Sequence, residues 1–224
     1  TGSVDVANVT GGEPALHPDI LEILRFCQRP EIGRIAMDSN GLRLAENPSL
    51  CRALADLGIC VTLSFDTFDP VVARKMHGRD VVAAKLQAIE NLTVAGVRMA
   101  LRYVMARNLN EDAIPGILRL MGENDAIRGL EVQTMAYAGK GSGSWPERSH
   151  VPADEAVRIL CERSEGQLAF TASLPHASAH PLCYLACTAI CSGGRLRSQR
   201  AQAAPDQRPR NDASVRTISV HSPM

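Results

Sequence analysis

Five apolar runs alternate with amphipathic stretches along the first 135 residues. The runs lack polar/apolar alternation, as strands do when both faces of a parallel sheet are covered, and they span residues 4–9, 34–37, 60–65, 98–105 and 130–135. The stretches between them have helical periodicity, at residues 18–27, 48–57, 81–95 and 113–121. One β-α unit of about thirty residues follows another without a reversal, which predicts an α/β fold whose parallel sheet is open or forms a partial barrel.

Short motifs at the predicted helix ends support this alternation. His17-Pro18, Asn47-Pro48 and Asp69-Pro70 each place a proline, which is favoured at the first helical position, after a residue that can cap or turn. Gly96 follows a predicted helix and leads into the next strand, as a C-terminal glycine does. Local chemistry and hydrophobic pattern therefore predict the same elements.

The pattern changes after residue 137, where we expect the core (residues 1–137) to end. A C-terminal extension of residues 138–192 follows, with helices predicted at 153–163 and 181–190. Residues 193–224 carry six arginines and two acidic residues with almost no apolar periodicity. Such a segment buries too little apolar surface to fold, so we expect a disordered, solvated tail.

Composition narrows the functional classes. Lysine plus arginine equals aspartate plus glutamate at 24 each, so no net field points to nucleic acid or to an anionic membrane. Aromatic residues make up 4%, too few for a base-stacking surface. No apolar run approaches the ~20 residues that a membrane-spanning helix needs. We therefore expect a cytoplasmic protein without a transmembrane segment or a nucleic-acid partner.

Polar residues gather at the carboxyl ends of the predicted strands, the edge at which α/β folds bind ligands. Two glycines there let a ligand approach the backbone closely, and a neighbouring carboxylate supplies a fixed acceptor. The polar residues are Gly11, Gly12, Glu13 and Pro14 after the first run, Asn40 after the second, Ser64 and Asp66 at the third, Arg102 in the fourth and Gln133 in the fifth. Together they predict one binding site.

Most of these residues also have a purely structural interpretation. The Gly-Gly-Glu-Pro segment can be a strand-to-helix turn, Asn40-Gly41 is a common turn dipeptide, and Asp66 can cap the next helix. Arg102 is harder to explain, because a guanidinium inside an apolar strand needs an anionic partner. A ligand carboxylate, Glu13 or Asp66 would serve.

These segments, in this order, resemble the radical SAM superfamily. The resemblance lies in Gly11-Gly12-Glu13-Pro14, in Ser39-Asn40-Gly41 and in Leu63-Ser64-Phe65-Asp66, and it covers about residues 4 to 192. It implies a partial (β/α)6 barrel of the TIM type that lacks its first β-α unit, with strands 2 to 6 in residues 1–137. The implied cofactors are S-adenosylmethionine and a [4Fe–4S] cluster.

The resemblance also implies a role for each polar residue. The methionyl amino group of S-adenosylmethionine would be held by Gly11, Gly12, Glu13 and Pro14. Its methionyl and ribose parts would be contacted by Asn40, Ser64 and Asp66. Its carboxylate would suit Arg102, and its adenine would be flanked by the strand around Gln133.

By this resemblance, the intact protein would reductively cleave S-adenosylmethionine to a 5′-deoxyadenosyl radical and modify an unreactive C–H bond. The subgroup of tetraether lipid synthase and methanopterin-modifying methylases is similar in Leu63-Ser64-Phe65-Asp66, in His77-Gly78-Arg79-Asp80 and, behind them, in Lys85, Ala88, Ile89, Glu90, Asn91 and Leu92. That subgroup implies a small-molecule substrate of lipid or pterin-like chemistry, with an electron donor such as ferredoxin or flavodoxin. Two alternatives stay open: a peptide-modifying radical SAM maturase, and a noncatalytic barrel that binds a ligand or partner.

The cysteines depart from the family pattern. The CxxxCxxC loop of the family is absent from all 224 residues, and by family topology it would precede Thr1. We therefore expect a truncated chain that is inactive by itself. Cys183, Cys187 and Cys191 have a different spacing and would line one face of a helix. They are candidate ligands of an auxiliary iron–sulfur cluster or zinc; the alternative is that they pack in a core.

Overall fold

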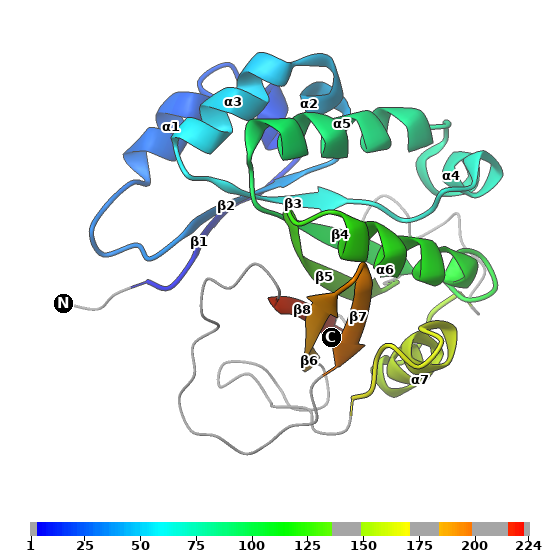
Figure 1. Ribbon diagram of the computed structural model, residues 1–224. Helices are drawn as coiled ribbons and strands as arrows, with labels where there is room; N and C mark the ends of the chain where they lie inside the picture. Colours follow the sequence, from blue (N-terminus) through cyan, green and yellow to red (C-terminus); the bar gives the residue numbers. More distant parts are fainter. Residues whose placement is uncertain (1–3, 136–148, 171–183, 199–214, 222–224) are drawn as a thin grey trace. The chain divides into compact units, whose positions relative to one another are not determined.

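Figure 1 shows a computed structural model of the chain, which describes residues 4–135, 149–170, 184–198 and 215–221. The chain forms two compact units. One consists of Thr1–Phe65 and Asp69–Leu101, and the other of Asp66–Phe68 and Arg102–Met224. Strand β4 (Met99–Met105) passes from the first unit to the second. The core boundary expected at residue 137 lies outside the described residues.

The first unit contains three parallel strands and a layer of helices (Figure 1). The strands β1 (Ala7–Val9), β2 (Ile35–Ser39) and β3 (Cys60–Ser64) pair in this order, all parallel. They are connected by a 3-10 turn, η1 (Pro14–Leu16), and by α1 (Ile20–Phe26), α2 (Leu42–Glu46) and α3 (Pro48–Asp56). After β3 come α4 (Pro70–His77) and α5 (Val82–Ala95).

The helix boundaries in this unit follow from their capping residues. Asn47 Oδ1 accepts a hydrogen bond from Leu50 N (3.0 Å), and Asp69 Oδ1 accepts one from Val71 N (2.7 Å), with a proline at the first helical position in both cases. Helix α5 ends at Gly96, whose φ of +79° lies in the left-handed region that favours glycine. The predicted helix starts at Pro48 and Pro70 are therefore confirmed, whereas the start predicted at Pro18 is wrong, because α1 begins at Ile20.

The core of the first unit lies between its helices and its strands. Side chains without solvent exposure include Leu24 of α1, Met37 of β2, Val61 and Leu63 of β3, and Leu92 of α5. Burying a side chain of this size stabilises the fold by about 1.5–3 kcal/mol. The apolar positions that predicted the elements thus hold the strand ends in a fixed register.

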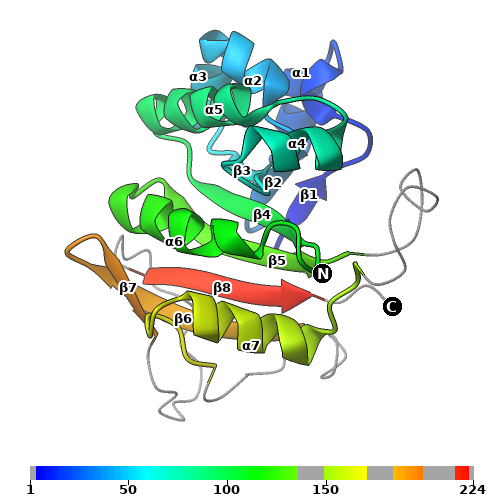
Figure 2. The same cartoon turned by 90° about the vertical axis from the view of Figure 1, so that its right-hand side faces the viewer.

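The second unit contains a sheet in which the last strand of the chain lies between two earlier ones. The strand order is β5 (Ile127–Thr134), β8 (Val215–His221), β6 (Tyr184–Ser192) and β7 (Arg195–Ser198). Strand β8 is parallel to β5 and antiparallel to β6, and β6 forms a hairpin with β7. Figure 2 shows α6 (Ile114–Glu123) and α7 (Ala153–Arg163) on one face of this sheet; η2 (Glu111–Ala113) precedes α6.

The predicted elements up to residue 163 are confirmed, but the helix predicted at residues 181–190 is wrong. Residues from Tyr184 to Ser192 form strand β6, because their backbone pairs with β8 on one side and with β7 on the other. A short apolar run of this kind fits a helix or a strand equally well in sequence, and tertiary pairing decides between them.

The prediction of a disordered tail from residue 193 onward is wrong for two segments. Arg195–Ser198 forms β7 and Val215–His221 forms β8, and Leu196, Ile218 and Val220 are fully buried. The remaining part of the predicted tail lies outside the described residues.

The predicted α/β fold with a sheet rich in parallel strands is confirmed. Among the helices of the described segments, none combines the length and the apolar character that crossing a bilayer requires.

Candidate functional site

The carboxyl ends of β1, β2 and β3 lie at the same edge, since the three strands are parallel and in register. The Gly11–Pro14 segment follows β1, Asn40 follows β2, and Ser64 is the last residue of β3. The first unit therefore places these predicted site residues along one edge, as the sequence led us to expect.

Glu13 ties the first two strand ends together. Its Oε1 accepts hydrogen bonds from Ser39 Oγ (2.8 Å) and from Ala15 N (3.2 Å), and its Oε2 accepts one from Asn40 N (2.6 Å). The bond from Ala15 also caps η1. The structure thus brings Glu13 and Asn40 into direct contact and fixes the position of the carboxylate.

The two glycines before Glu13 leave the backbone accessible. Gly11 has a φ of +146°, and a Cβ added at Gly11 or at Gly12 would meet no atom of the described chain within 4 Å. Both residues are exposed. A ligand can therefore approach this backbone closely, and Oε2 of Glu13 keeps acceptor capacity for a positively charged group, because a carboxylate oxygen accepts more than one hydrogen bond.

Asn40 and Gly41 form the turn that their sequence predicts. Asn40 Oδ1 accepts a hydrogen bond from Leu42 N (2.9 Å), and Gly41 has a φ of +83°. A Cβ at Gly41 would lie 2.7 Å from Leu63 Cδ1, so the turn packs tightly onto β3. The side-chain nitrogen Nδ2 of Asn40 has no hydrogen-bond partner among the described residues, which leaves this donor for a ligand, whereas the backbone nitrogen of Asn40 already donates to Glu13.

Ser64 is held by a lysine of the subgroup motif, to which the sequence analysis assigned no role in the site. Lys85 of α5 is 4% exposed, and its Nζ donates to Ser64 O and to Ser64 Oγ, both at 2.7 Å. The signal in the sequence was a lysine at a position where the periodicity of the helix places a core residue.

Asp66, Arg102 and Gln133 belong to the second unit. Asp66 is 3% exposed; its Oδ1 accepts from Val104 N (2.8 Å), and its carbonyl accepts from Asn110 Nδ2 (3.0 Å). The following helix is capped by Asp69, so the capping role considered for Asp66 is wrong. Burial raises the pKa of the nearby Tyr103 hydroxyl well above its ordinary value, and the charge of Asp66 raises that pKa further.

Arg102 has a protein carboxylate as its partner. Its Nε and Nη2 donate to Glu131 Oε2 of β5, at 3.1 and 2.8 Å. The anionic partner expected for the Arg102 guanidinium is therefore Glu131, and not Glu13 or Asp66 as considered from the sequence. Glu131 was missed, although it precedes Gln133 by two residues and so points to the same face of the strand.

A polar face is formed where β5 and β8 pair. Glu131 lies opposite Ser219, and Gln133 lies opposite His221, so these side chains share one face with Arg102. Ser219 Oγ and His221 Nε2 are hydrogen-bonded at 2.9 Å. Burial lowers the pKa of His221, Glu131 opposes this shift and Arg102 adds to it. We call the set Arg102, Glu131, Gln133, Ser219 and His221 the polar sheet face.

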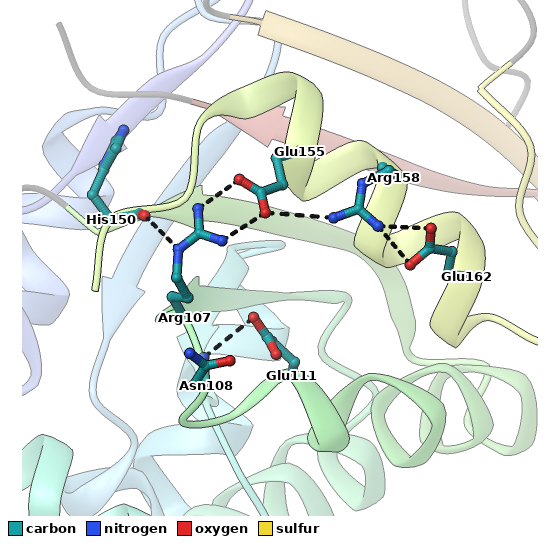
Figure 3. Close-up of polar contacts among 7 residues, drawn as sticks. All are labelled: Arg107, Asn108, Glu111, His150, Glu155, Arg158 and Glu162. Atoms are coloured by element: carbon teal, nitrogen blue, oxygen red, sulfur yellow. Dashed lines mark hydrogen bonds and ion pairs between the residues drawn. The ribbon is translucent and has the colours of Figure 1, made fainter. Parts of the chain in front are cut away.

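A second ionic cluster joins the end of β4 to α7 (Figure 3). Arg107 donates from Nη1 to Glu155 Oε1 (2.6 Å) and from Nη2 to Glu155 Oε2 (2.5 Å), and its Nε donates to the carbonyl of His150 (3.3 Å). The hydrogen bonds from Arg107 lower the pKa of the Glu155 carboxyl. Within α7, Arg158 continues the cluster to Glu162 at 2.7 Å. This cluster fixes the helix and the segment before it.

The described part of the cysteine trio lies on the helix-covered side of the second sheet. Cys187 is buried opposite Ile218, and burial raises the pKa of its thiol to about 12. Cys191 Sγ donates to the carbonyl of Gly122 in α6 (3.2 Å). Cys183 lies outside the described residues. The role of the three as cluster ligands stays a prediction.

Comparison with known proteins identifies the family. The model of the radical SAM superfamily matches residues 1–121, which is more than half of the 224 residues. The chain therefore belongs to the radical SAM superfamily, and the resemblance seen in its sequence is confirmed.

Two curated relatives illustrate the range of the family. The GTP 3',8-cyclase of Bradyrhizobium diazoefficiens is 30% identical over 139 residues, which cover 59% of this chain and 40% of that protein. The 7,8-dihydro-6-hydroxymethylpterin dimethyltransferase of Methanocaldococcus jannaschii is 22% identical over 178 residues, which cover 78% of this chain and 35% of that protein. The chain thus spans less than half the length of these relatives.

A solved structure confirms the architecture. The enzyme anSMEcpe, with bound AdoMet and a peptide, aligns with a TM-score of 0.53 at 18% identity, over 71% of this chain and 45% of its own. At this identity the likeness concerns the fold, which is the partial barrel of radical SAM enzymes.

The superfamily implies S-adenosylmethionine and a [4Fe–4S] cluster, and the residues of this chain fit the first of these groups. The strand edge of the first unit offers an open glycine backbone, the acceptor Glu13 and the side-chain amide of Asn40. For the cluster, the sequence has no CxxxCxxC, and the described residues contain no group of three His, Cys, Asp or Glu side chains that could hold a metal.

Proposed function

We propose that the intact protein is a radical SAM enzyme and that this chain supplies most of its S-adenosylmethionine site. When bound and reduced, S-adenosylmethionine supplies a carbon-centred radical that takes hydrogen from an unreactive C–H bond. The observation that carries the proposal is the contact of Glu13 with Ser39 and Asn40, beside an open glycine backbone.

The chain's own residues would bind and orient the methionyl end. Glu13 would accept hydrogen bonds from the ammonium of the ligand, and Asn40 would donate to the ligand from its side-chain nitrogen Nδ2. Because Ser39 and Asn40 hold the Glu13 carboxylate before the ligand arrives, little ordering is needed on binding. Asp66, Arg102 and Gln133 remain proposed contacts in the second unit, with Arg102 already neutralised by Glu131.

A polar, pterin-like substrate is supported over a lipid. The polar sheet face has donors and acceptors but little net charge, since Arg102 pairs with Glu131 and the pKa of His221 is lowered. A hydrocarbon chain there would leave buried polar groups without partners, which costs about 1–3 kcal/mol each. The names of both relatives, a GTP cyclase and a pterin dimethyltransferase, denote substrates with nitrogen-containing rings. The peptide-modifying alternative has the peptide-bound structure of similar fold in its favour.

The electron donor (ferredoxin or flavodoxin) and the cytoplasmic location remain predictions from the sequence. So does the noncatalytic alternative, which predicts ligand binding without turnover.

The proposal is tested at Glu13. In the intact protein with its cluster reconstituted under anaerobic conditions, Glu13→Gln should weaken S-adenosylmethionine binding about tenfold or more, because hydrogen bonds to charged groups contribute about 1.5–3 kcal/mol. Isothermal titration calorimetry measures the affinity.

Glu22→Gln, at an exposed position in α1, is the matched control and should leave the affinity unchanged. Circular dichroism must show that both variants are folded. An affinity of Glu13→Gln equal to that of the unaltered protein would contradict the assignment.

A further inference from the structure

The ammonium of Lys85 lies under the end of β3, at the strand edge described above. Lys85 is a member of α5, on the face that also buries Ala88, Ile89 and Leu92. Its side chain crosses from the helix to the strand, where Nζ donates to both oxygens of Ser64 at 2.7 Å. Lysine is rarely buried to this extent, because removing its charge from water is costly.

The two hydrogen bonds determine how the hydroxyl of Ser64 is oriented. A lysine ammonium has donors only, so Ser64 Oγ must accept at this contact. The hydroxyl has one hydrogen, which must then point to a different acceptor. No acceptor for it is found among the described residues, and Ser64 is half-buried rather than closed off. Ser64 is therefore held as a hydrogen-bond donor directed away from Lys85.

We infer that Lys85 is a positioning residue for S-adenosylmethionine: it holds the Ser64 hydroxyl as a donor to an acceptor oxygen of the ligand, a ribose hydroxyl or the methionyl carboxylate. The inference rests on the proposed function and adds a residue to it. Glu13 can only accept hydrogen bonds, which suits the ammonium of the ligand. Ser64 is held as a donor, which suits an oxygen of the same ligand.

A purely structural role for Lys85 predicts something different. In that case the ammonium only fastens α5 to β3, and its loss lowers the stability of the fold without changing how tightly the ligand binds. Stability and affinity therefore separate the two roles.

The first experiment measures both quantities in the intact, reconstituted protein. Lys85→Met keeps the length of the side chain and removes its donors. We expect S-adenosylmethionine affinity, measured by calorimetry, to fall about two- to tenfold, which is the loss of one hydrogen bond of 0.5–1.5 kcal/mol. Lys75→Met, at an exposed position of α4, is the control and should bind as the unaltered protein does.

A double-mutant cycle shows whether Lys85 acts through Ser64. Ser64→Ala removes the hydroxyl but keeps the carbonyl that Lys85 also contacts. If the inference is right, Ser64→Ala weakens binding to a similar degree, and Lys85→Met has no further effect in the Ser64→Ala background. In the ligand-free protein, the two changes should also be non-additive in melting temperature.

Three results would overturn the inference. One is a Lys85→Met protein that melts at a lower temperature but binds with unaltered affinity. Another is full additivity of the two changes in affinity. If Lys85→Met does not fold, unaltered affinity of Ser64→Ala overturns it by itself. Failure of the unaltered, reconstituted protein to bind S-adenosylmethionine would instead overturn the proposed function, and this inference with it.

Discussion

A single carboxylate organises the best-defined part of the site. Glu13 caps η1 through Ala15 and holds the end of β2 through Ser39 and Asn40. The Gly-Gly-Glu-Pro segment therefore forms the turn that its structural interpretation predicts, and its role in ligand binding stays a prediction. The segment is a strand-to-helix turn, and the turn orients a charged acceptor at the strand edge.

His221 gives the second unit a pH-dependent stability. Its folded pKa lies below the ordinary 6.5, first because of burial and also because of Arg102, while Glu131 acts in the opposite direction. A depressed folded pKa means that the unfolded chain binds the proton more tightly. The contribution to stability is thus fully present above about pH 6.5 and is lost as the pH falls toward the folded pKa.

We expect the proton resonance of His221 to titrate below pH 6.5, as measured by NMR and assigned with His221→Gln. The free energy of unfolding should fall less between pH 7.5 and 5 in His221→Gln than in the unaltered protein. Glu131→Gln should move the midpoint lower still, because it removes the carboxylate that favours the charged imidazolium. A midpoint at or above 6.5 in the unaltered protein would contradict the buried environment described for His221.

At the scale of elements, close packing of α6 against the β6–β7 hairpin is the most sensitive contact. Gly122 of α6 is buried, and a Cβ built there would lie 2.2 Å from the carbonyl oxygen of Gly194, between β6 and β7. Backbone atoms cannot move aside as a flexible side chain does. The glycine is therefore required by the approach of the hairpin, against its poor helix propensity.

Gly122→Ala should lower the free energy of unfolding by about 1–3 kcal/mol, the usual cost of overpacking, although alanine is the better helix former. Urea unfolding followed by circular dichroism measures this. Gly12→Ala serves as the stability control, because an added Cβ there meets open space. Equal stability of Gly122→Ala and the unaltered protein would show that the hairpin does not pack as described.

The sequence predicted the elements up to residue 163 well, because their apolar periodicity agrees with their caps at Asn47 and Asp69. It failed for β6, where local pattern is ambiguous and pairing with β8 decides. It placed Glu13, Asn40 and Ser64 correctly at strand ends, but it assigned no contact to Lys85, Glu131 or His221. Lys85 reaches Ser64 from a helix, and Glu131 and His221 meet Arg102 and Gln133 only because strands far apart in the chain pair. Local sequence patterns do not reveal such contacts.

At the scale of the whole molecule, the chain combines a family fold with cysteine spacings that differ from the family pattern. The radical SAM superfamily is shown by the match over residues 1–121, whereas the cysteines present do not have the family spacing. On strand β6, the Cα atoms of Cys187 and Cys191 are about 13 Å apart, twice the distance that the expected helix would give. This spacing favours packing over joint ligation.

We expect Cys187→Ser in the intact, reconstituted protein to leave the iron content and the visible spectrum unchanged and to lower the melting temperature, because the thiol is buried in the apolar core. If Cys187 instead ligates an auxiliary [4Fe–4S] cluster, the change should remove about four irons per chain. Cys27→Ser, in a half-buried position after α1, is the control for general effects of thiol loss.

The position of β8 has a consequence for how the chain is made. Strand β8 (residues 215–221) lies between β5 and β6 in the sheet. Until β8 has been synthesised, the β6–β7 hairpin has no strand that connects it to β5. Until then, β5 presents an open strand edge, the kind of surface that recruits other chains. The second unit therefore cannot assemble progressively on the ribosome, and an mRNA that stops before the codon for Val215 should yield a product prone to aggregation and degradation.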